Sequence, residues 1–183
     1  YHSSDSKRTI NRPEFANNVL ATGKAIPLQN GNLGIFLTGY DASNNKSVFF
    51  AEVTKDMSSV RITNNKLFDS NELMSPGLTC YKNQYHLLIH KRHSTLQLST
   101  IEHWVSDCGD SGYTKLSEFG NEYNDNNSVW LEGWSDSFLV FTENDKLYCL
   151  MAGTSRYLES GTRADRVVGL MEYDDNTNTW GIV

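Results

Sequence analysis

One stretch decides the fold: Leu78-Thr-Cys-Tyr-Lys-Asn-Gln-Tyr-His-Leu-Leu-Ile89. Two short apolar runs flank Lys82-Asn83, and Asn tolerates the positive φ that a tight β-hairpin turn requires. The stretch therefore predicts a hairpin. The same pattern occurs twice more, over Ile26–Leu37 with a turn at Asn30-Gly31 and over Phe138–Leu150 with a turn at Asn144-Asp145.

A second landmark follows each hairpin, and the two landmarks repeat together. The hairpin turns lie 52 and 62 positions apart, counted from Gly31 to Asn83 and from Asn83 to Asp145. The second landmarks are Thr54–Arg61, Cys108–Lys115 and Tyr173–Trp180. No segment carries the apolar stripe of an amphipathic helix. A period of about 50–60 residues with four strands per unit is typical of β-propeller blades.

The predicted fold class is all-β, with three consecutive four-stranded antiparallel blades. Residues 1–24 are expected to be an irregular lead-in or the end of a preceding blade. The blades are expected at 25–70, 71–122 and 123–183, the last with an insertion near 155–166. Closed propellers normally have at least four blades. We therefore expect a fragment of a larger propeller, or a ring completed by another chain or by the stretch before Ala25.

Composition excludes several classes of function. Hydrophobic residues make up 38% and charged residues 21%, which is typical of a globular domain. The net charge is −6, and a nucleic-acid partner is not expected because binding to phosphates needs a basic face. No apolar run is long enough to span a bilayer, so membrane insertion is not expected either. The first residues have no apolar core of the kind found in secretory signals.

The cysteines and histidines predict neither a metal site nor a cofactor. Cys80, Cys108 and Cys149 lie far apart and form no C-x-x-C motif, and no His and carboxylate have metal-ligand spacing. Cys80 and Cys149 lie in apolar runs, where a thiol usually acts as a small hydrophobe. His86 and His103 are expected to be structural.

The second landmark resembles the Asp box of the sialidases, Ser-x-Asp-x-Gly-x-Thr-Trp. Cys108–Lys115 keeps the Asp, Gly and Thr, Tyr173–Trp180 keeps the Asp, Thr and Trp, and Thr54–Arg61 keeps the Asp and a hydroxyl. In such a box the Asp caps backbone N–H groups of a turn between outer strands, while the aromatic packs between sheets. The resemblance implies a sialidase-like propeller.

The order of elements resembles the later blades of phage endosialidases, which are tailspike enzymes that cleave polysialic acid. Ser75–His90 matches their strand pair, with Ser75 in place of a Glu and His90 in place of an Arg. Ala152–Arg156 matches their Gly-Ser-x-Arg turn, and Ala25-Ile-Pro27 keeps the Ile-Pro of the sialidase Arg-Ile-Pro motif. The resemblance implies host-glycan recognition on a virion tail or outside the cell, an acidic polysaccharide as partner, and a homotrimer. The alternative to a homotrimer is that the rest of a longer parent chain supplies the missing blades.

Five cationic residues are candidate ligand contacts. Arg156 follows the apolar run Leu147–Ala152, and a guanidinium matches a sugar carboxylate in two parallel hydrogen bonds. Arg163 and Arg166 share its polar insertion. His90 and Arg92 end a strand of the second blade and are expected on the same face as Arg156. The competing interpretation is that these are solvated loop cations.

Glu132 and Asp136 are the candidate catalytic carboxylates. Glu132 lies between Trp130 and Trp134, and a carboxyl against aromatic walls has a raised pKa suited to a general acid. The two indoles are also candidate stacking surfaces for sugar rings. The competing interpretation is that both Trp side chains pack between blades while Glu132 points outward.

The residues leave three functions open. The first is a sialidase-like propeller that binds an acidic polysaccharide, and the missing Glu at Ser75 favours binding without hydrolysis. The second is a fragment of a five-bladed furanosidase-type glycoside hydrolase, in which Glu132 and Asp136 matter more than any arginine. The third is a non-enzymatic propeller that serves as scaffold or protein-binding surface. Enzyme activity is not decided by the sequence.

Overall fold

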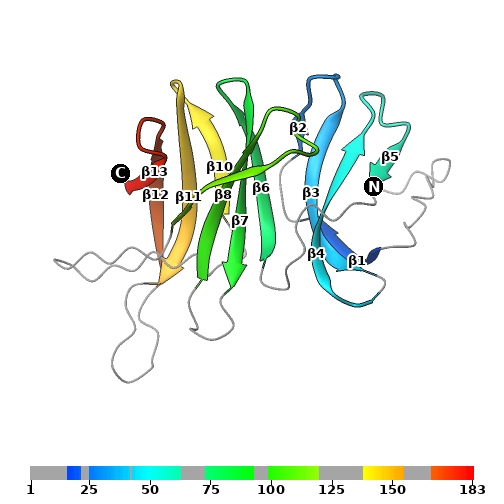
Figure 1. Ribbon diagram of the computed structural model, residues 1–183, viewed down its shortest axis with the longest axis horizontal. Helices are drawn as coiled ribbons and strands as arrows, with labels where there is room; N and C mark the ends of the chain where they lie inside the picture. The colour runs from blue at the N-terminus through cyan, green and yellow to red at the C-terminus, as the bar shows by residue number, and fades with distance from the viewer. Residues whose placement is uncertain are drawn as a thin grey trace.

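Three antiparallel sheets lie side by side in the computed structural model (Figure 1). The structure describes residues 16–21, 25–41, 43–62, 73–92, 99–119, 138–154 and 166–183. These residues contain strands, turns and bends but no helix, and hence no helix long and apolar enough to cross a membrane. The prediction of an all-β chain built from three consecutive antiparallel sheets is confirmed.

The first sheet has five strands, one more than predicted. Its order is β1-β3-β4-β5, and the short β2 also pairs with β3. The strands are β1 (Ala16–Ala21), β2 (Ile26–Pro27), β3 (Leu33–Asp41), β4 (Lys46–Val53) and β5 (Val60–Ile62). The extra strand is β1, which comes from the segment expected to be an irregular lead-in or the end of a preceding blade. The predicted boundaries of the blades stay predictions.

The second and third sheets have four strands each, in sequence order. The second holds β6 (Leu73–Tyr81), β7 (Gln84–Arg92), β8 (Ser99–Ser106) and β9 (Thr114–Phe119). The third holds β10 (Phe138–Glu143), β11 (Lys146–Thr154), β12 (Arg166–Asp174) and β13 (Thr179–Ile182). Each strand therefore pairs with the next strand along the chain.

The predicted hairpin turns lie where the sequence placed them. Lys82 and Asn83 have φ of 48° and 63°, and Asn144 and Asp145 have φ of 50° and 57°. Two successive positive φ angles give the turn whose twist matches that of paired strands. In the first sheet Gly31 has φ of 82° and its N–H donates to the Leu28 carbonyl.

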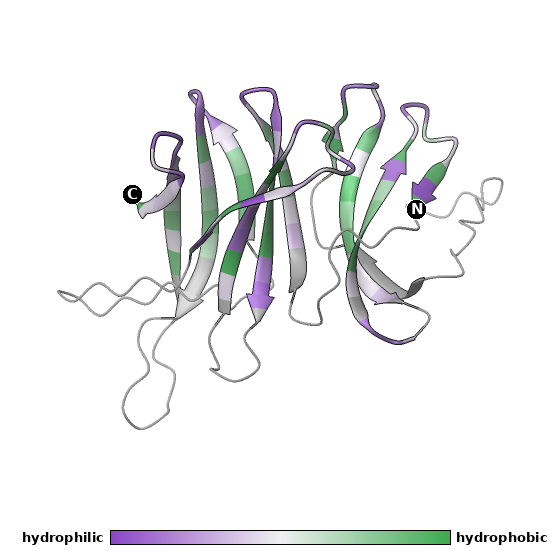
Figure 2. Cartoon of the chain, viewed as in Figure 1, coloured by the Kyte–Doolittle hydropathy of each residue, from purple (hydrophilic) through white to green (hydrophobic). Residues whose placement is uncertain are grey.

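The second sheet is buried on both faces because successive residues of β7 point to opposite sides. Leu87 and Ile89 pack into a cluster with Phe36 and Phe50 of the first sheet. Leu88, between them in sequence, belongs to a cluster with the third sheet. Figure 2 shows the resulting bands of apolar residues within the strands and the polar turns at the hairpin end.

The second cluster joins the second and third sheets. Its third-sheet members are Val140, Leu147, Cys149, Met151, Met171, Tyr173 and Trp180. Trp180 stacks on Phe119 of β9, with ring centroids 4.7 Å apart. The middle sheet therefore fixes the positions of both its neighbours.

The sequence predicted that Cys80 and Cys149 act as small hydrophobic residues in apolar runs. This is right for Cys149 and wrong for Cys80. Cys149 is buried in the cluster between the second and third sheets, whereas Cys80 and Cys108 are exposed, and all three are free thiols. Cys80 lies beside the Lys82-Asn83 turn, at the solvent-exposed end of β6, so the apolar run around it does not bury it.

Candidate functional site

Three of the predicted ligand residues have backbone at one edge of the sheets, opposite the hairpin turns and lowest in Figure 1. We call this the lower edge. Arg92 ends β7, where it pairs with Ser99 at the start of β8. Arg166 begins β12, where it pairs with Thr154 at the end of β11. His90 lies two residues before Arg92 on β7.

The His90 ring does not lie on the surface. It is 4% exposed and is placed on the same face of β7 as Leu88, toward the third sheet. The sequence predicted that it would offer a cationic contact at a surface. Its position at the lower edge agrees with that prediction, but its burial does not, and its role in ligand binding stays a prediction.

The other candidate residues lie outside the described part of the chain. They are Trp130, Glu132, Trp134, Asp136, Arg156 and Arg163. Their roles stay predictions. The sequence nevertheless places Asp136 two residues before β10 and Arg156 two residues after β11.

The first strands of the second and third sheets are neighbours. β6 contacts β10, and it also contacts β3 and β4 of the first sheet. All three sheets therefore meet along β6. β10 begins at the lower edge, because Phe138 at its start pairs with Met151 near the end of β11.

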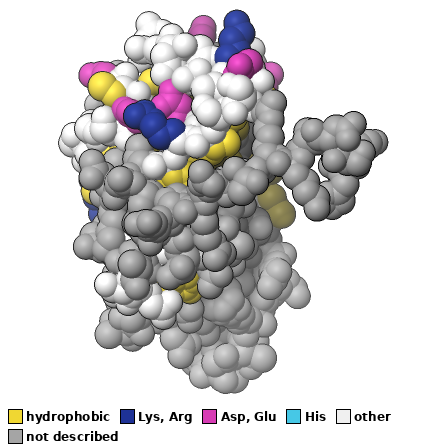
Figure 3. All heavy atoms as spheres, turned by 90° about the vertical axis from the view of Figure 1, so that its right-hand side faces the viewer, with side chains coloured by type: hydrophobic (Ala, Val, Ile, Leu, Met, Phe, Trp, Pro, Cys, Tyr) yellow, Lys and Arg dark blue, Asp and Glu magenta, His cyan; other side chains and the backbone are white. Residues whose placement is uncertain are grey.

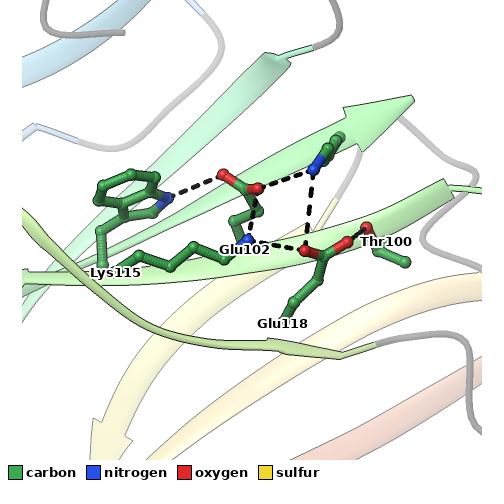
Figure 4. A network of polar contacts seen from close by, with 6 residues as sticks. Thr100, Glu102, Lys115 and Glu118 are labelled. Atoms are coloured by element: carbon green, nitrogen blue, oxygen red, sulfur yellow. Dashed lines mark hydrogen bonds and ion pairs between the residues drawn. The ribbon is translucent and has the colours of Figure 1, made fainter. Parts of the chain in front are cut away.

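A cluster of charged side chains lies on β7, β8 and β9 (Figure 4). Glu102 is 5% exposed and accepts hydrogen bonds from Lys91 at 3.1 Å, Lys115 at 2.7 Å and the Trp104 indole at 3.1 Å. Lys115 also forms an ion pair with Glu118 at 2.7 Å. Two carboxylates thus face two ammonium groups, and the buried charge of Glu102 is compensated.

The pKa values in this cluster agree with a structural role. Burial tends to raise the pKa of Glu118, but hydrogen bonds from Lys115 and Thr100 outweigh it and lower that pKa to about 2. Burial tends to lower the pKa of Lys115, and its hydrogen bonds to Glu102 and Glu118 raise it instead. A carboxylate held ionised and a lysine held protonated are poorly suited to exchange protons near neutral pH.

Two histidines and a tryptophan form a buried chain between the second and third sheets. The Trp180 indole donates to Nδ1 of His103 at 3.2 Å, so that nitrogen carries no proton. In the neutral ring Nε2 of His103 then holds the proton and donates to Nδ1 of His86 at 2.8 Å. Burial lowers the pKa of His103 to about 3 and that of His86 to about 4. Both rings are neutral at pH 7, and their location between sheets agrees with the expected structural role.

A surface pocket of about 320 Å³ lies at the hairpin end of the second and third sheets, opposite the lower edge. It is lined by Cys80, Tyr81, Lys82, Thr142, Glu143, Asn144 and Asp145. The Tyr81 hydroxyl lies 3.1 Å from both the Asp145 carbonyl and the Asp175 carboxylate, and these two acceptors share its one proton. Lys82 forms an ion pair with the same carboxylate. These contacts tie the sheets together, and no predicted site residue lies among them.

The landmarks compared with the Asp box join the last two strands of each sheet. Asp56 accepts from the Ser58 N–H at 2.9 Å and from its hydroxyl at 2.6 Å, which lowers the pKa of Asp56 to about 2. In the third sheet Asp174, rather than Asp175, accepts a backbone N–H, from Asn176 at 2.9 Å. In the second sheet the Cys108 N–H donates to the Ser106 hydroxyl. The turns share their position but not one common set of contacts.

No group of three or more His, Cys, Asp or Glu side chains within the described ranges is arranged to hold a metal ion. The charged cluster around Glu102 is the site feature that sequence reasoning missed. Its members are adjacent only because β7, β8 and β9 pair in a particular register, and no motif in the sequence encodes that register.

Comparison with known proteins rests on structure alone. No protein-family model matches the sequence, and no curated protein matches it. A family 117 glycoside hydrolase of the marine bacterium Zobellia galactanivorans superposes with a TM-score of 0.64 at 11% identity, over 92% of this chain and 55% of its own. A family 43 β-xylosidase/α-arabinofuranosidase from a compost metagenome, solved with xylotriose, gives 0.65 at 12% identity, over 91% and 57%.

A family 32 β-fructofuranosidase of Bombyx mori, solved with sucrose, gives a TM-score of 0.58 at 15% identity. The match covers 87% of this chain and 35% of that one. These neighbours are β-propeller hydrolases, so the three sheets are propeller blades. The chain spans from about a third to under two thirds of the length of such structures. A sialidase or a tailspike is not among the three.

Proposed function

We propose that this chain is part of a glycan-binding and glycan-hydrolysing β-propeller of the furanosidase or xylosidase type. The observation that supports the proposal is that two candidate residues stand at the same edge of adjacent sheets. The backbones of Arg92 and Arg166 lie there, at the ends of strands in adjacent sheets. The propeller hydrolases that share this fold include a xylosidase/arabinofuranosidase and a fructofuranosidase.

Three further candidates are close in sequence to strands that end or begin at the same edge. Asp136 precedes Phe138, the first residue of β10, by two residues, and Arg156 follows Thr154, the last residue of β11, by two. Two residues span at most about 7 Å. We therefore propose that Asp136 and Arg156 act at the lower edge, and that Glu132, four residues farther from β10 in sequence than Asp136, acts with them.

The proposed chemistry divides two roles between two carboxyl groups. Glu132 acts as the general acid that protonates the leaving glycosidic oxygen, because its indole neighbours favour the protonated form. Asp136 acts as the second carboxylate, which either attacks the sugar or activates a water molecule. Trp130 and Trp134 stack on sugar rings, while Arg156 and Arg163 bind their polar groups.

The test is hydrolysis of 4-nitrophenyl α-L-arabinofuranoside and 4-nitrophenyl β-D-xyloside by the full 183-residue chain and its variants. Glu132→Gln and Asp136→Asn are each expected to lower kcat/KM by at least about 100-fold, the usual contribution of a general acid or base. Glu143→Gln, an exposed carboxylate at the hairpin end, is the matched control and should leave the rate unchanged. Equal rates for all four proteins would refute the carboxylate assignment.

A sialidase-like propeller that binds an acidic polysaccharide is the second candidate. The observation that favours it is that Asp56 accepts the Ser58 backbone N–H in the turn between β4 and β5, the kind of contact that the Asp of an Asp box makes. In this alternative the protein belongs to a virion tail or acts outside the cell, and it assembles as a trimer. The Asp-box assignment itself stays a prediction.

Binding to polysialic acid and to arabinoxylan in affinity electrophoresis separates the two candidates. The sialidase-like function predicts retardation by polysialic acid that is lost in Arg156→Ala. The furanosidase-type function predicts retardation by arabinoxylan that persists in the same variant at reduced strength. Retardation by neither polymer would favour a propeller that acts as scaffold or protein-binding surface.

A further inference from the structure

Tyr40 is a partly exposed aromatic residue at the lower edge of the first sheet. β3 begins beside the Gly31 turn at the hairpin end, so its last residues, Tyr40 and Asp41, lie at the opposite edge (Figure 1). β3 pairs with β4 without a register shift from Leu33 to Tyr40, so successive residues point to opposite faces. Tyr40 is therefore on the same face as Phe36, which packs against the second sheet.

The repeat of the sheets gives Tyr40 two counterparts. Tyr40, Arg92 and Thr154 are 52 and 62 positions apart, which are also the intervals between the hairpin turns. The register agrees, because the residue three positions earlier in each case pairs with the first strand of its own sheet. These residues are Leu37, Ile89 and Met151. Tyr40 thus holds in the first sheet the place that the candidate ligand residue Arg92 holds in the second.

The first strands of the first two sheets are both irregular at this height. In the first sheet, two residues of β1 lie opposite Gly39 alone, next to Tyr40. In the second sheet, Ser75 of β6 is an extra residue between the partners of Ile89 and His90. Such β-bulges bend a strand and are frequent at rims and next to active sites. Two bulges in adjacent sheets near the lower edge favour a functional role for the residues around them.

The facing side of the second sheet offers a fixed polar group. Lys91 is on the same face of β7 as Leu87 and Ile89, which pack against the first sheet. Its ammonium group donates to Glu102 at 3.1 Å, and its side chain is 23% exposed. An ammonium group has three N–H donors, so it can also donate to a sugar hydroxyl. Aromatic rings together with a few fixed polar groups are what ligand sites are built from.

The surface around Tyr40 is distinct from the outer face of the first sheet. That outer face is on the side toward the viewer in Figure 3, which shows charged side chains toward its top. On it, Leu37, Phe49 and Ala51 are each less than 9% exposed. Tyr40 instead lies on the side where two described sheets of the same chain meet.

We propose that Tyr40 stacks on a sugar residue of a polymeric substrate and thereby favours polymers over short glycosides. The proposal rests on the proposed function, in which the catalytic carboxylates Glu132 and Asp136 belong to the third sheet. Packed sheets lie about 10 Å apart, so the first sheet is roughly 20 Å from the third. A single sugar ring does not span that distance, whereas an oligosaccharide does. The flat, apolar face of Tyr40 therefore meets the C–H groups of a sugar away from the bond that is cleaved.

Hydrolysis of arabinoxylan and of 4-nitrophenyl α-L-arabinofuranoside by the full 183-residue chain tests the proposal. Tyr40→Ala should lower kcat/KM on arabinoxylan by about tenfold, the usual effect of losing one aromatic contact, and leave kcat/KM on the aryl glycoside unchanged. Tyr40→Phe keeps the ring and should retain the rate on both substrates. Tyr148→Ala changes a partly exposed tyrosine near the hairpin end of β11 and is the matched control.

The outcomes separate this role from the proposed function. No hydrolysis of either substrate by the unaltered chain would refute the proposed function, and the role of Tyr40 with it. If the unaltered chain hydrolyses both substrates, an unchanged kcat/KM of Tyr40→Ala on arabinoxylan overturns the role of Tyr40 alone. Equal losses on the two substrates also overturn it, as does a chain that hydrolyses only the aryl glycoside.

A second variant keeps the test valid if Tyr40→Ala does not fold. Tyr40→Leu retains an apolar side chain but no flat ring, so it should show the same selective loss on arabinoxylan. Urea unfolding of each variant confirms that it is folded under the conditions of the assay. A Tyr40→Leu variant as active on arabinoxylan as the unaltered chain overturns the stacking role.

Discussion

The buried histidine pair gives the molecule a defined response to acid. In the unfolded chain both rings have the ordinary histidine pKa near 6.5, while burial lowers the folded pKa of His86 to about 4 and of His103 to about 3. At a pH between the folded pKa and the unfolded pKa, each histidine binds more protons in the unfolded state than in the folded state. The free energy of unfolding therefore falls as the pH drops below 6.5. The contribution of the two histidines levels off only below about pH 3, where both rings are protonated in the folded and the unfolded state.

We therefore predict a lower midpoint of urea unfolding at pH 5 than at pH 7.5, followed by tryptophan fluorescence. The loss for the pair should be on the order of 2–4 kcal/mol. His103→Gln removes one titrating ring and should reduce the difference between the two pH values. A midpoint that is equal at pH 5 and pH 7.5 would show that these histidines are not buried as neutral rings.

The three thiols differ in reactivity because only one of them is buried. Burial raises the pKa of Cys149 to about 12, and the thiol is the unreactive form. Ellman's reagent at pH 8 should therefore modify two thiols in the folded protein and three in 6 M guanidinium. Cys80→Ser should lower both counts by one, while Cys149→Ser should lower only the count in denaturant. Modification of one thiol or of all three before unfolding would contradict this assignment.

At the scale of single strands, Gly34 of β3 stands where the packing leaves no room for a side chain. A Cβ atom at this position would lie 2.7 Å from Cζ of Phe50 and 2.8 Å from a methyl group of Leu28. Gly34→Ala should destabilise the protein by about 1–3 kcal/mol, the usual cost of overpacking. Gly181→Ala on β13 meets nothing within 4 Å and is the matched control. Urea unfolding measures the free energy of unfolding of the two variants. Equal values would show that the Phe50 ring does not pack against Gly34.

The hairpins could be predicted because their signals are local. Asn83, Asn144 and Gly31 stand at turns that need positive φ, and the alternating apolar residues on either side fix the strands. Cys80 was predicted to be buried and is exposed. Its exposure depends on where β6 ends relative to the neighbouring sheet. Composition around a residue carries no such information.

The polar networks could not be predicted for a different reason. Glu102 reaches Lys115 across a register shift that lies between His103 and Trp104. The partnership of His86 with His103 likewise depends on how β7 pairs with β8, and their link to Trp180 depends on how two sheets pack. Of the candidate site, only the strand-end positions of His90, Arg92 and Arg166 could be compared with the structure.

At the scale of the whole molecule, the second sheet couples the two apolar clusters. Leu87 belongs to the cluster between the first and second sheets, and Leu147 belongs to the cluster between the second and third sheets. Leu87→Ala and Leu147→Ala should each lower the free energy of unfolding by about 2–5 kcal/mol. Because the clusters share one sheet, both variants should still unfold in a single transition by fluorescence and circular dichroism. Val168→Ala, at an exposed position of β12, should cost less than about 0.5 kcal/mol. Two separate transitions would show that the sheets are independent.

The pairing of each strand with a near neighbour in sequence has a consequence for synthesis. A chain emerges from the ribosome at roughly 5–20 residues per second, N-terminus first. Within the described residues, the strands of each sheet pair only with strands of the same sheet, so none of the three sheets waits for a strand of a later one. Each sheet can complete its strand pairing within seconds after its last strand leaves the exit tunnel. The following sheet can then pack against it. Among the strands that the structure describes, at most one sheet is thus unfinished at any time during synthesis, which limits the apolar surface that chaperones must shield.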